Sequence, residues 1–99
     1  MAIAKPDIVH LLETNRQALK RFGVRRVGVF GSAARGTASA GSDVDVLVTL
    51  DQPSFDGYMD LKFFLEELFH REVDLVLEPA LKPRLRASIL NEVMYASGF

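Results

Sequence analysis

Three aspartates, Asp43, Asp45 and Asp74, are the residues of this 99-residue chain best suited to chemistry. Asp43 and Asp45 are separated by one valine, and the apolar run 46–48 follows at once. Because side chains two apart in a strand point to the same face, the two carboxylates should lie side by side. Two anions held that close repel each other unless a cation lies between them or one is protonated. Hard oxygen ligands favour Mg²⁺, with Mn²⁺ as the alternative.

Asp74 can complete this acidic pair. It lies near the start of the β-rich segment 72–78, as Asp45 lies near the start of segment 43–50. If the two segments are parallel neighbours in one sheet, both aspartates lie at the same end of that sheet. Three acids can hold two metal ions, an arrangement used for in-line phosphoryl and nucleotidyl displacement. We therefore predict a two-metal site on Asp43, Asp45 and Asp74.

A phosphate-binding turn is predicted directly after the β-rich segment 24–30. Gly31 lets the backbone approach a ligand closely, and a helix starting there would offer free N–H groups and a positive dipole end. The Ser32 hydroxyl can donate to a phosphate, and Arg35 can neutralise phosphate charge one turn later. If segment 24–30 runs antiparallel to segment 43–50, this turn meets the carboxylates. The residues after Gly36 do not fit a Walker loop, and the spacing of Gly28 and Gly31 does not fit a dinucleotide fingerprint.

Each of these features also has a purely structural explanation. Gly31 and Ser32 could form a tight turn with a helix cap, and Arg35 could pair with a surface acid. Asp43 and Asp45 could begin a solvated edge strand. Ser42 could hydrogen bond within its loop and orient Asp43, as an alternative to contacting a nucleotide.

The surrounding pattern predicts the elements that must position these residues. Helical periodicity is found in three places, and a short helix is expected to open at the glycine turn. The order is α-β-α-β-α-β-α, and the helix between the second and third strands implies a parallel crossover. We expect one domain over residues 1–99, of α/β (α+β) class, with a three-stranded mixed sheet and about four helices. The expected helices are 6–22, 31–36, one from residue 55 or 58 to 69, and one from residue 85 to an end near residue 98. The expected strands are 24–30, 43–50 and 72–78.

Composition narrows the function classes further. The chain has a formal net charge of −1 and 48% hydrophobic residues, so a strongly basic nucleic-acid binder and a disordered chain are not expected. It has no cysteine, and it shows neither a secretory signal nor a membrane-spanning stretch. We expect a cytoplasmic protein. Segment 63–69 has more apolar residues than one buried helix face needs. The excess could form a wide core face, a homo-oligomer contact or a surface for a partner protein.

The motif as a whole resembles the signature of the minimal nucleotidyltransferases. Gly31-Ser32-Ala33-Ala34-Arg35-Gly36 is followed after five residues by Ser42-Asp43-Val44-Asp45, and the segment 73–76 resembles the third acidic element of that family. These proteins belong to the DNA polymerase β-like nucleotidyltransferase superfamily. The resemblance extends from segment 24–30 to the last helix and shows no departure at the motif positions.

The resemblance implies a mechanism and a set of roles. Asp43 and Asp45 would bind both metal ions, and Asp74 would bind the catalytic metal and help deprotonate the acceptor hydroxyl. Ser32, with the Gly31 backbone, would grip the triphosphate of ATP. The acceptor oxygen would attack the α-phosphorus, and pyrophosphate would leave. Arg35 and Ser42 complete the predicted nucleotide-binding set.

The resemblance also implies a partner. Minimal nucleotidyltransferases are commonly paired with a HEPN-type protein as antitoxin and toxin, and the similar antitoxins transfer AMP from ATP to a tyrosine of that partner. We therefore expect a protein adenylyltransferase that acts on a HEPN-type toxin. Two alternatives remain: a binding module that neutralises a toxin without catalysis, and a nucleotidyltransferase that modifies a small molecule.

Overall fold

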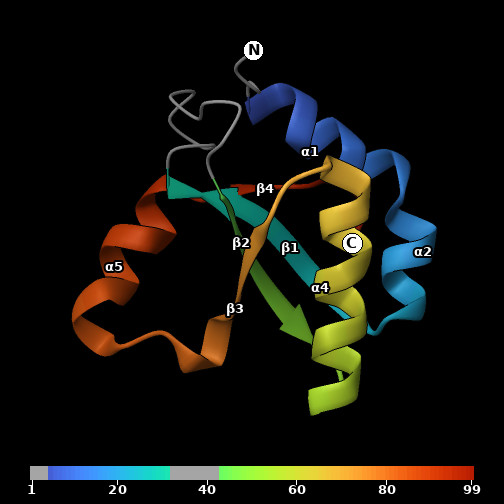
Figure 1. Ribbon diagram of the computed structural model, residues 1–99. Helices are drawn as coiled ribbons and strands as arrows, with labels where there is room; N and C mark the ends of the chain where they lie inside the picture. The colour runs from blue at the N-terminus through green and yellow to red at the C-terminus, as the bar shows by residue number, and fades with distance from the viewer. Residues whose placement is uncertain (1–4, 32–42) are drawn as a thin grey trace.

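Four strands form one mixed sheet in the order β3-β2-β1-β4 (Figure 1). The computed structural model describes residues 5–31 and 43–99. The strands are β1 (Val24–Phe30), β2 (Val44–Leu50), β3 (Val73–Leu77) and β4 (Met94–Tyr95). The helices are α1 (Lys5–Thr14), α2 (Arg16–Arg21), α4 (Phe55–Phe69), the short 3-10 helix η1 (Glu78–Ala80) and α5 (Pro83–Glu92).

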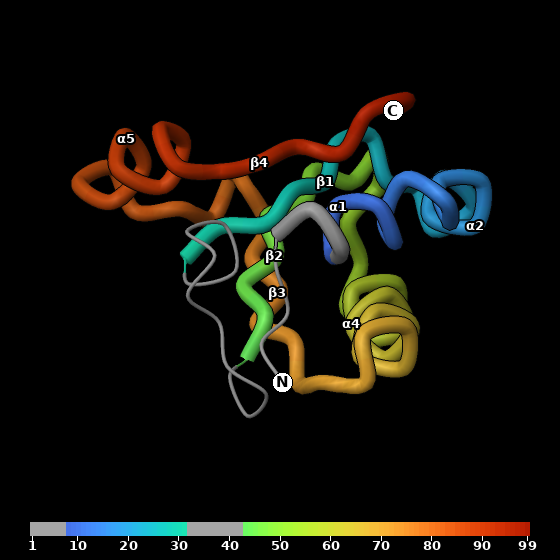
Figure 2. The backbone as a smooth tube through the Cα atoms, turned by 90° about the horizontal axis from the view of Figure 1, so that it is seen from above, coloured from blue at the N-terminus to red at the C-terminus, as the bar shows by residue number. Residues whose placement is uncertain are grey.

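The hydrophobic core lies between one face of the sheet and the helices α1, α2 and α4. Alternate residues of β1, β2 and β3 point to this face, as the period of a strand requires. Helix α5 lies on the other side of the sheet from α4 and has no buried residue (Figure 2). Within residues 5–31 and 43–99, no helix combines the length and apolar character needed to cross a membrane. The most deeply buried core side chains are Ile8, Leu12, Leu19, Val27, Val29, Val44, Val46, Val48, Leu61 and Leu65.

The predicted mixed sheet and its strand directions are confirmed. β1 runs antiparallel to β2, and β2 runs parallel to β3 through the crossover helix α4. The strand boundaries agree with the expected ones to within one residue. The candidate site required β2 to be parallel to β3 and antiparallel to β1, and both pairings are present.

The sheet gains a fourth strand where the last helix was expected to continue. Residue Met94, predicted to be helical, lies in β4, because α5 ends at Glu92 and Val93 is extended (φ −66°, ψ 137°). β4 pairs with the outer edge of β1, whose backbone groups would otherwise have no partner strand on that side. Pairing with this open edge decided the structure of a segment that has no strand pattern of its own.

The first predicted helix, 6–22, is two helices in the structure. Asn15 separates α1 from α2, with φ −109° and ψ 18°, and its side-chain amide donates to the Leu11 carbonyl at 2.9 Å. Such local side-chain bonds compete with the helical backbone pattern, which explains the break. The short helix predicted over 31–36 lies, beyond Gly31, outside the described residues.

Glu66 anchors the start of β3 to α4. Its Oε2 accepts hydrogen bonds from the Val73 backbone N–H at 3.0 Å and from the Lys62 ammonium at 2.9 Å. The hydrogen bond from the Val73 N–H is the main cause that holds the pKa of the Glu66 carboxyl below its usual value, and the hydrogen bond from Lys62 is the second. Because Val73 immediately precedes Asp74, this anchor fixes the strand end on which the third candidate acid lies.

The assigned core face predicts that substitutions at two residues of α4 differ strongly in their effect on the free energy of unfolding. Leu65 is fully buried and Phe63 is 56% exposed. Leu65→Ala should lower the free energy of unfolding by about 2–5 kcal/mol, since it leaves a cavity. Phe63→Ala, the control on the same helix, should change it by roughly 0.5 kcal/mol. Chemical denaturation monitored by circular dichroism measures both, and equal losses would contradict the assigned core face.

The Glu66 anchor predicts a pH-dependent stability. A carboxyl whose pKa is lowered on folding stabilises the protein above its unfolded pKa, and this contribution is lost as the pH falls through the folded pKa. Wild type should therefore be more stable than Glu66→Gln at neutral pH, and the difference should shrink on acidification below about pH 4.3. Denaturation curves between pH 7 and pH 3 test this, with Glu67→Gln as control. A difference that stays constant with pH would refute the anchor.

Candidate active site

Asp45 and Asp74 lie side by side at one end of the sheet. They are Cα partners in the parallel pairing of β2 with β3. Their flanking valines, Val44 and Val73, are buried in the core, so both aspartates point to the opposite face. Asp45 is half-buried and Asp74 is exposed. Asp43 is also exposed and directly precedes β2, which places the three predicted acids at the same sheet end.

Gly31 brings the end of β1 against Asp45. Phe30 is the Cα partner of Asp45 in the antiparallel pairing, so Gly31 is the next residue beyond this pair. A Cβ atom on Gly31 would lie 2.2 Å from Asp45 Oδ2, and Gly31 has a φ of +68°, in the left-handed region. Only glycine satisfies both conditions without strain. The Asp45 carboxylate therefore occupies the space that a side chain at position 31 would need.

Glu92, at the end of α5, is a fourth acid at this place that the sequence did not indicate. Its Oε1 accepts a hydrogen bond from the Gly31 backbone N–H at 2.9 Å. In the sequence it is the only acid of the amphipathic segment 83–92, and nothing in the pattern of that segment relates it to Gly31. Its approach depends on α5 ending at this residue and on β4 returning along β1, and neither event leaves a local signal.

The carboxylate set has the chemistry that Mg²⁺ requires, although the side chains have not converged in this conformation. In the described part of the chain, no three His, Cys, Asp or Glu side chains come close enough together to hold a metal ion. Asp43 and Asp74 are exposed, so they can change rotamer without repacking the core. Rotation of these two side chains toward Asp45 is therefore what a metal ion would require.

The predicted phosphate grip can be located at Gly31 alone. Ser32, Arg35 and Ser42 lie outside the residues that the structure describes. In the conformation seen here the Gly31 N–H donates to Glu92, so that N–H is already engaged. The contribution of Gly31 visible in the structure is its missing side chain, which admits Asp45.

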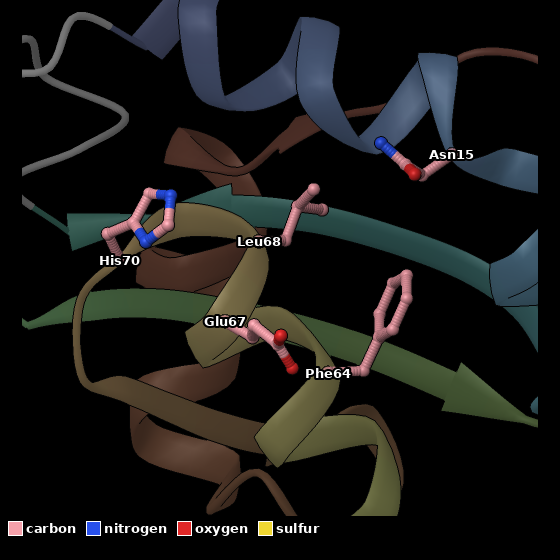
Figure 3. Close-up of a pocket in the computed structure, with 5 residues that line it drawn as sticks. All are labelled: Asn15, Phe64, Glu67, Leu68 and His70. Atoms are coloured by element: carbon pink, nitrogen blue, oxygen red, sulfur yellow. The ribbon is translucent and has the colours of Figure 1, made fainter.

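A hollow of about 450 Å³ lies elsewhere, between the α1–α2 junction and the end of α4 (Figure 3). Its position among the core-covering helices puts the sheet between it and the acids, which point to the opposite face. The hollow is therefore no part of the candidate site. Its lining residues are Asn15, Phe64, Glu67, Leu68 and His70.

Comparisons with known proteins find similarity over most of the chain. Residues 11–96 match the family model described as a nucleotidyltransferase domain. The protein adenylyltransferase MntA of Thermococcus cleftensis is 42% identical over 91 residues, which cover 90% of this chain and 92% of that protein. A solved structure described as a candidate minimal nucleotidyltransferase is 36% identical, with a TM-score of 0.80 over 93% of this chain and 95% of that one.

A further solved structure shares the fold at low identity. It contains a tri-AMPylated Shewanella oneidensis HEPN toxin in complex with an MNT antitoxin. The matching chain superposes with a TM-score of 0.65 at 18% identity and covers 92% of this chain and 73% of that one. At this identity the likeness concerns the fold alone.

The close approach of Asp45 predicts that Gly31 and Gly23 differ in their tolerance of alanine. Both have positive φ, but a Cβ at Gly23 would meet nothing within 4 Å. Gly23→Ala should therefore cost only the backbone strain, about 1–2 kcal/mol. Gly31→Ala should cost at least about 1 kcal/mol more, and Asp45→Ala should remove the excess in a double-mutant cycle. Equal losses for the two glycines, measured by denaturation, would refute the close approach.

Proposed function

This chain belongs to the nucleotidyltransferase domain family, and we propose that it transfers AMP from ATP to a hydroxyl group of a partner protein. The observation that carries the proposal is the double contact of one residue. Asp45 is in register with Asp74 on one side and packs against Gly31 on the other. Two of the predicted metal ligands therefore lie next to the first residue of the predicted phosphate turn, which supports a shared site. The similarity to a protein adenylyltransferase supports AMP as the transferred group.

The chain's own residues supply binding and proton transfer in this proposal. Asp43, Asp45 and Asp74 would hold Mg²⁺, which when bound neutralises phosphate charge and polarises the α-phosphate. Ser32, Arg35 and Ser42, with the turn at Gly31, would hold the triphosphate. Asp74 would take the proton of the acceptor hydroxyl. The hydroxyl oxygen then attacks the α-phosphorus, the bond to the β-phosphate oxygen breaks, and pyrophosphate leaves.

A protein acceptor is favoured by the exposure of the site. Asp43 and Asp74 are both exposed at the end of the sheet, on the face away from the main helix layer. A hydroxyl on a large partner can reach Asp74 there without the chain opening. By analogy with the complex that shares this fold, we propose a HEPN-type toxin as the partner and an antitoxin role for this chain.

A second candidate function is neutralisation of the toxin by binding alone. Phe55 and Phe63 lie eight residues apart on α4 and are 77% and 56% exposed. Two exposed aromatic side chains on one helix face are typical of a contact surface. In this alternative the chain covers the active face of its partner, and nucleotide transfer is dispensable.

Transfer is tested with purified protein, Mg²⁺ and ATP labelled on the α-phosphate. The neighbouring gene product and a cell lysate serve as acceptors. We expect label on a protein band, and a loss of at least about a hundredfold in the Asp43→Asn, Asp45→Asn double variant. Asp60→Asn, an exposed acid on α4, is the matched control and should transfer normally. Label on a soluble compound instead would point to a small-molecule acceptor.

The same variants separate catalysis from binding in cells. If transfer is the essential act, the Asp43→Asn, Asp45→Asn variant should fail to protect cells that express the partner toxin. Full protection by this variant, with no label on the toxin, would favour the binding function. Phe55→Ala with Phe63→Ala should then abolish protection.

A further inference from the structure

The C-terminal segment is seated tightly along the last half of β1. Tyr95 pairs with Gly28, and the Ala96 N–H donates to the Val27 carbonyl at 2.9 Å. A Cβ atom on Gly28 would lie 2.7 Å from the Met94 carbonyl oxygen, so glycine is required for this approach. The segment after α5 therefore fixes the strand that leads into Gly31.

Glu92 extends this contact to the turn itself. It is the last residue of α5, and its carboxylate accepts the Gly31 N–H in a partly buried bond of 2.9 Å. Hydrogen bonds with an ionised acceptor are roughly twice as strong as neutral ones. The bond joins residues 61 positions apart in the chain. It ties the end of β1 to a helix that contributes nothing to the main core.

Two carboxylates thus define the position of one glycine. Asp45 occupies the space beside the Gly31 Cα, and Glu92 holds its N–H. Asp45 is placed by the sheet, and Glu92 is placed by the end of α5 and by β4. Moving either one changes the direction in which the chain leaves β1. Gly31 is the residue at which the predicted phosphate-binding turn begins.

We propose that Glu92 is a positioning residue for nucleotide transfer, which fixes the Gly31 turn against Asp45. This inference rests on the proposed function for its consequence and on the Gly31 contacts for its geometry. Glu92 influences the reacting atoms only indirectly, through its hydrogen bond to the backbone of Gly31. Loss of the bond should misplace the triphosphate relative to the carboxylates, where displacements of about 1 Å cost roughly a hundredfold in rate.

Three variants test the role of Glu92. Glu92→Ala removes the hydrogen-bond acceptor, Glu92→Gln keeps an acceptor oxygen without the charge, and Asn91→Ala is the control at the exposed neighbouring position. The first readout is hydrogen exchange of the Gly31 amide by NMR, which needs no activity. The second is the affinity for a non-hydrolysable ATP analogue with Mg²⁺. The third is kcat and KM for transfer.

In Glu92→Ala the Gly31 amide should exchange at least about tenfold faster, because the bond to a charged acceptor is lost. Analogue affinity should fall about tenfold and kcat about a hundredfold, so the loss falls mainly on the chemical step. Glu92→Gln should stay within about fivefold of wild type in all three, since a neutral hydrogen bond remains. Asn91→Ala should match wild type.

Two results would overturn the proposal. Unchanged Gly31 exchange and unchanged kcat in Glu92→Ala would show that the bond has no positioning role. Tighter analogue binding in both Glu92 variants would show that the carboxylate competes with phosphate for the Gly31 N–H. A third result would separate the two proposals. If wild type neither binds the analogue nor transfers AMP, the proposed function fails. If Glu92→Ala still speeds exchange of the Gly31 amide in that case, the positioning of Gly31 by Glu92 stands.

Discussion

The register of β2 against its two neighbours is the constraint on which the rest of the structure depends. Val44, Val46 and Val48 are each at most 1% exposed, and their burial fixes which face of β2 meets the helices. A slip of one residue would bury Asp45 and expose these valines. The same burial therefore builds the core and holds Asp45 in line with Asp74 and beside Gly31. The candidate site is a by-product of core packing at the end of the sheet, which explains how so small a chain can position it.

The parts that follow from local pattern were predictable from the sequence. Alternation and β-rich composition gave the three main strands, and the length of the intervening helix gave the parallel crossover that aligns Asp45 with Asp74. The resemblance to a known family added the proposed roles of these acids. The break at Asn15, the strand β4 and the contact of Glu92 were not predicted. Each depends on competition between alternative bonds or on pairing between segments far apart in the chain, which periodicity does not report.

The two halves of the candidate site are held in different ways. Asp45 and Asp74 lie on strands whose alternate residues are buried, so hydrophobic packing places them. Gly31 is placed by a steric fit to Asp45 and by one hydrogen bond that its N–H donates to Glu92. The Glu66 bond to Val73 gives β3 a comparable anchor one residue before Asp74. Hydrophobic packing thus places the strands, and hydrogen bonds between distant segments fix the backbone at Gly31 and Val73.

Helix α5 has no buried residue, whereas Ala96, directly after β4, belongs to the hydrophobic core. Segments with little buried apolar surface open at a smaller free energy than the whole domain. Warming should therefore release α5 while β4 stays paired with β1 and the other helices still cover the sheet, and Glu92 would leave Gly31 at that point. The temperature at which the site loses its geometry would then lie below the melting temperature of the fold. The upper temperature limit of activity would be set by the docking of this one helix.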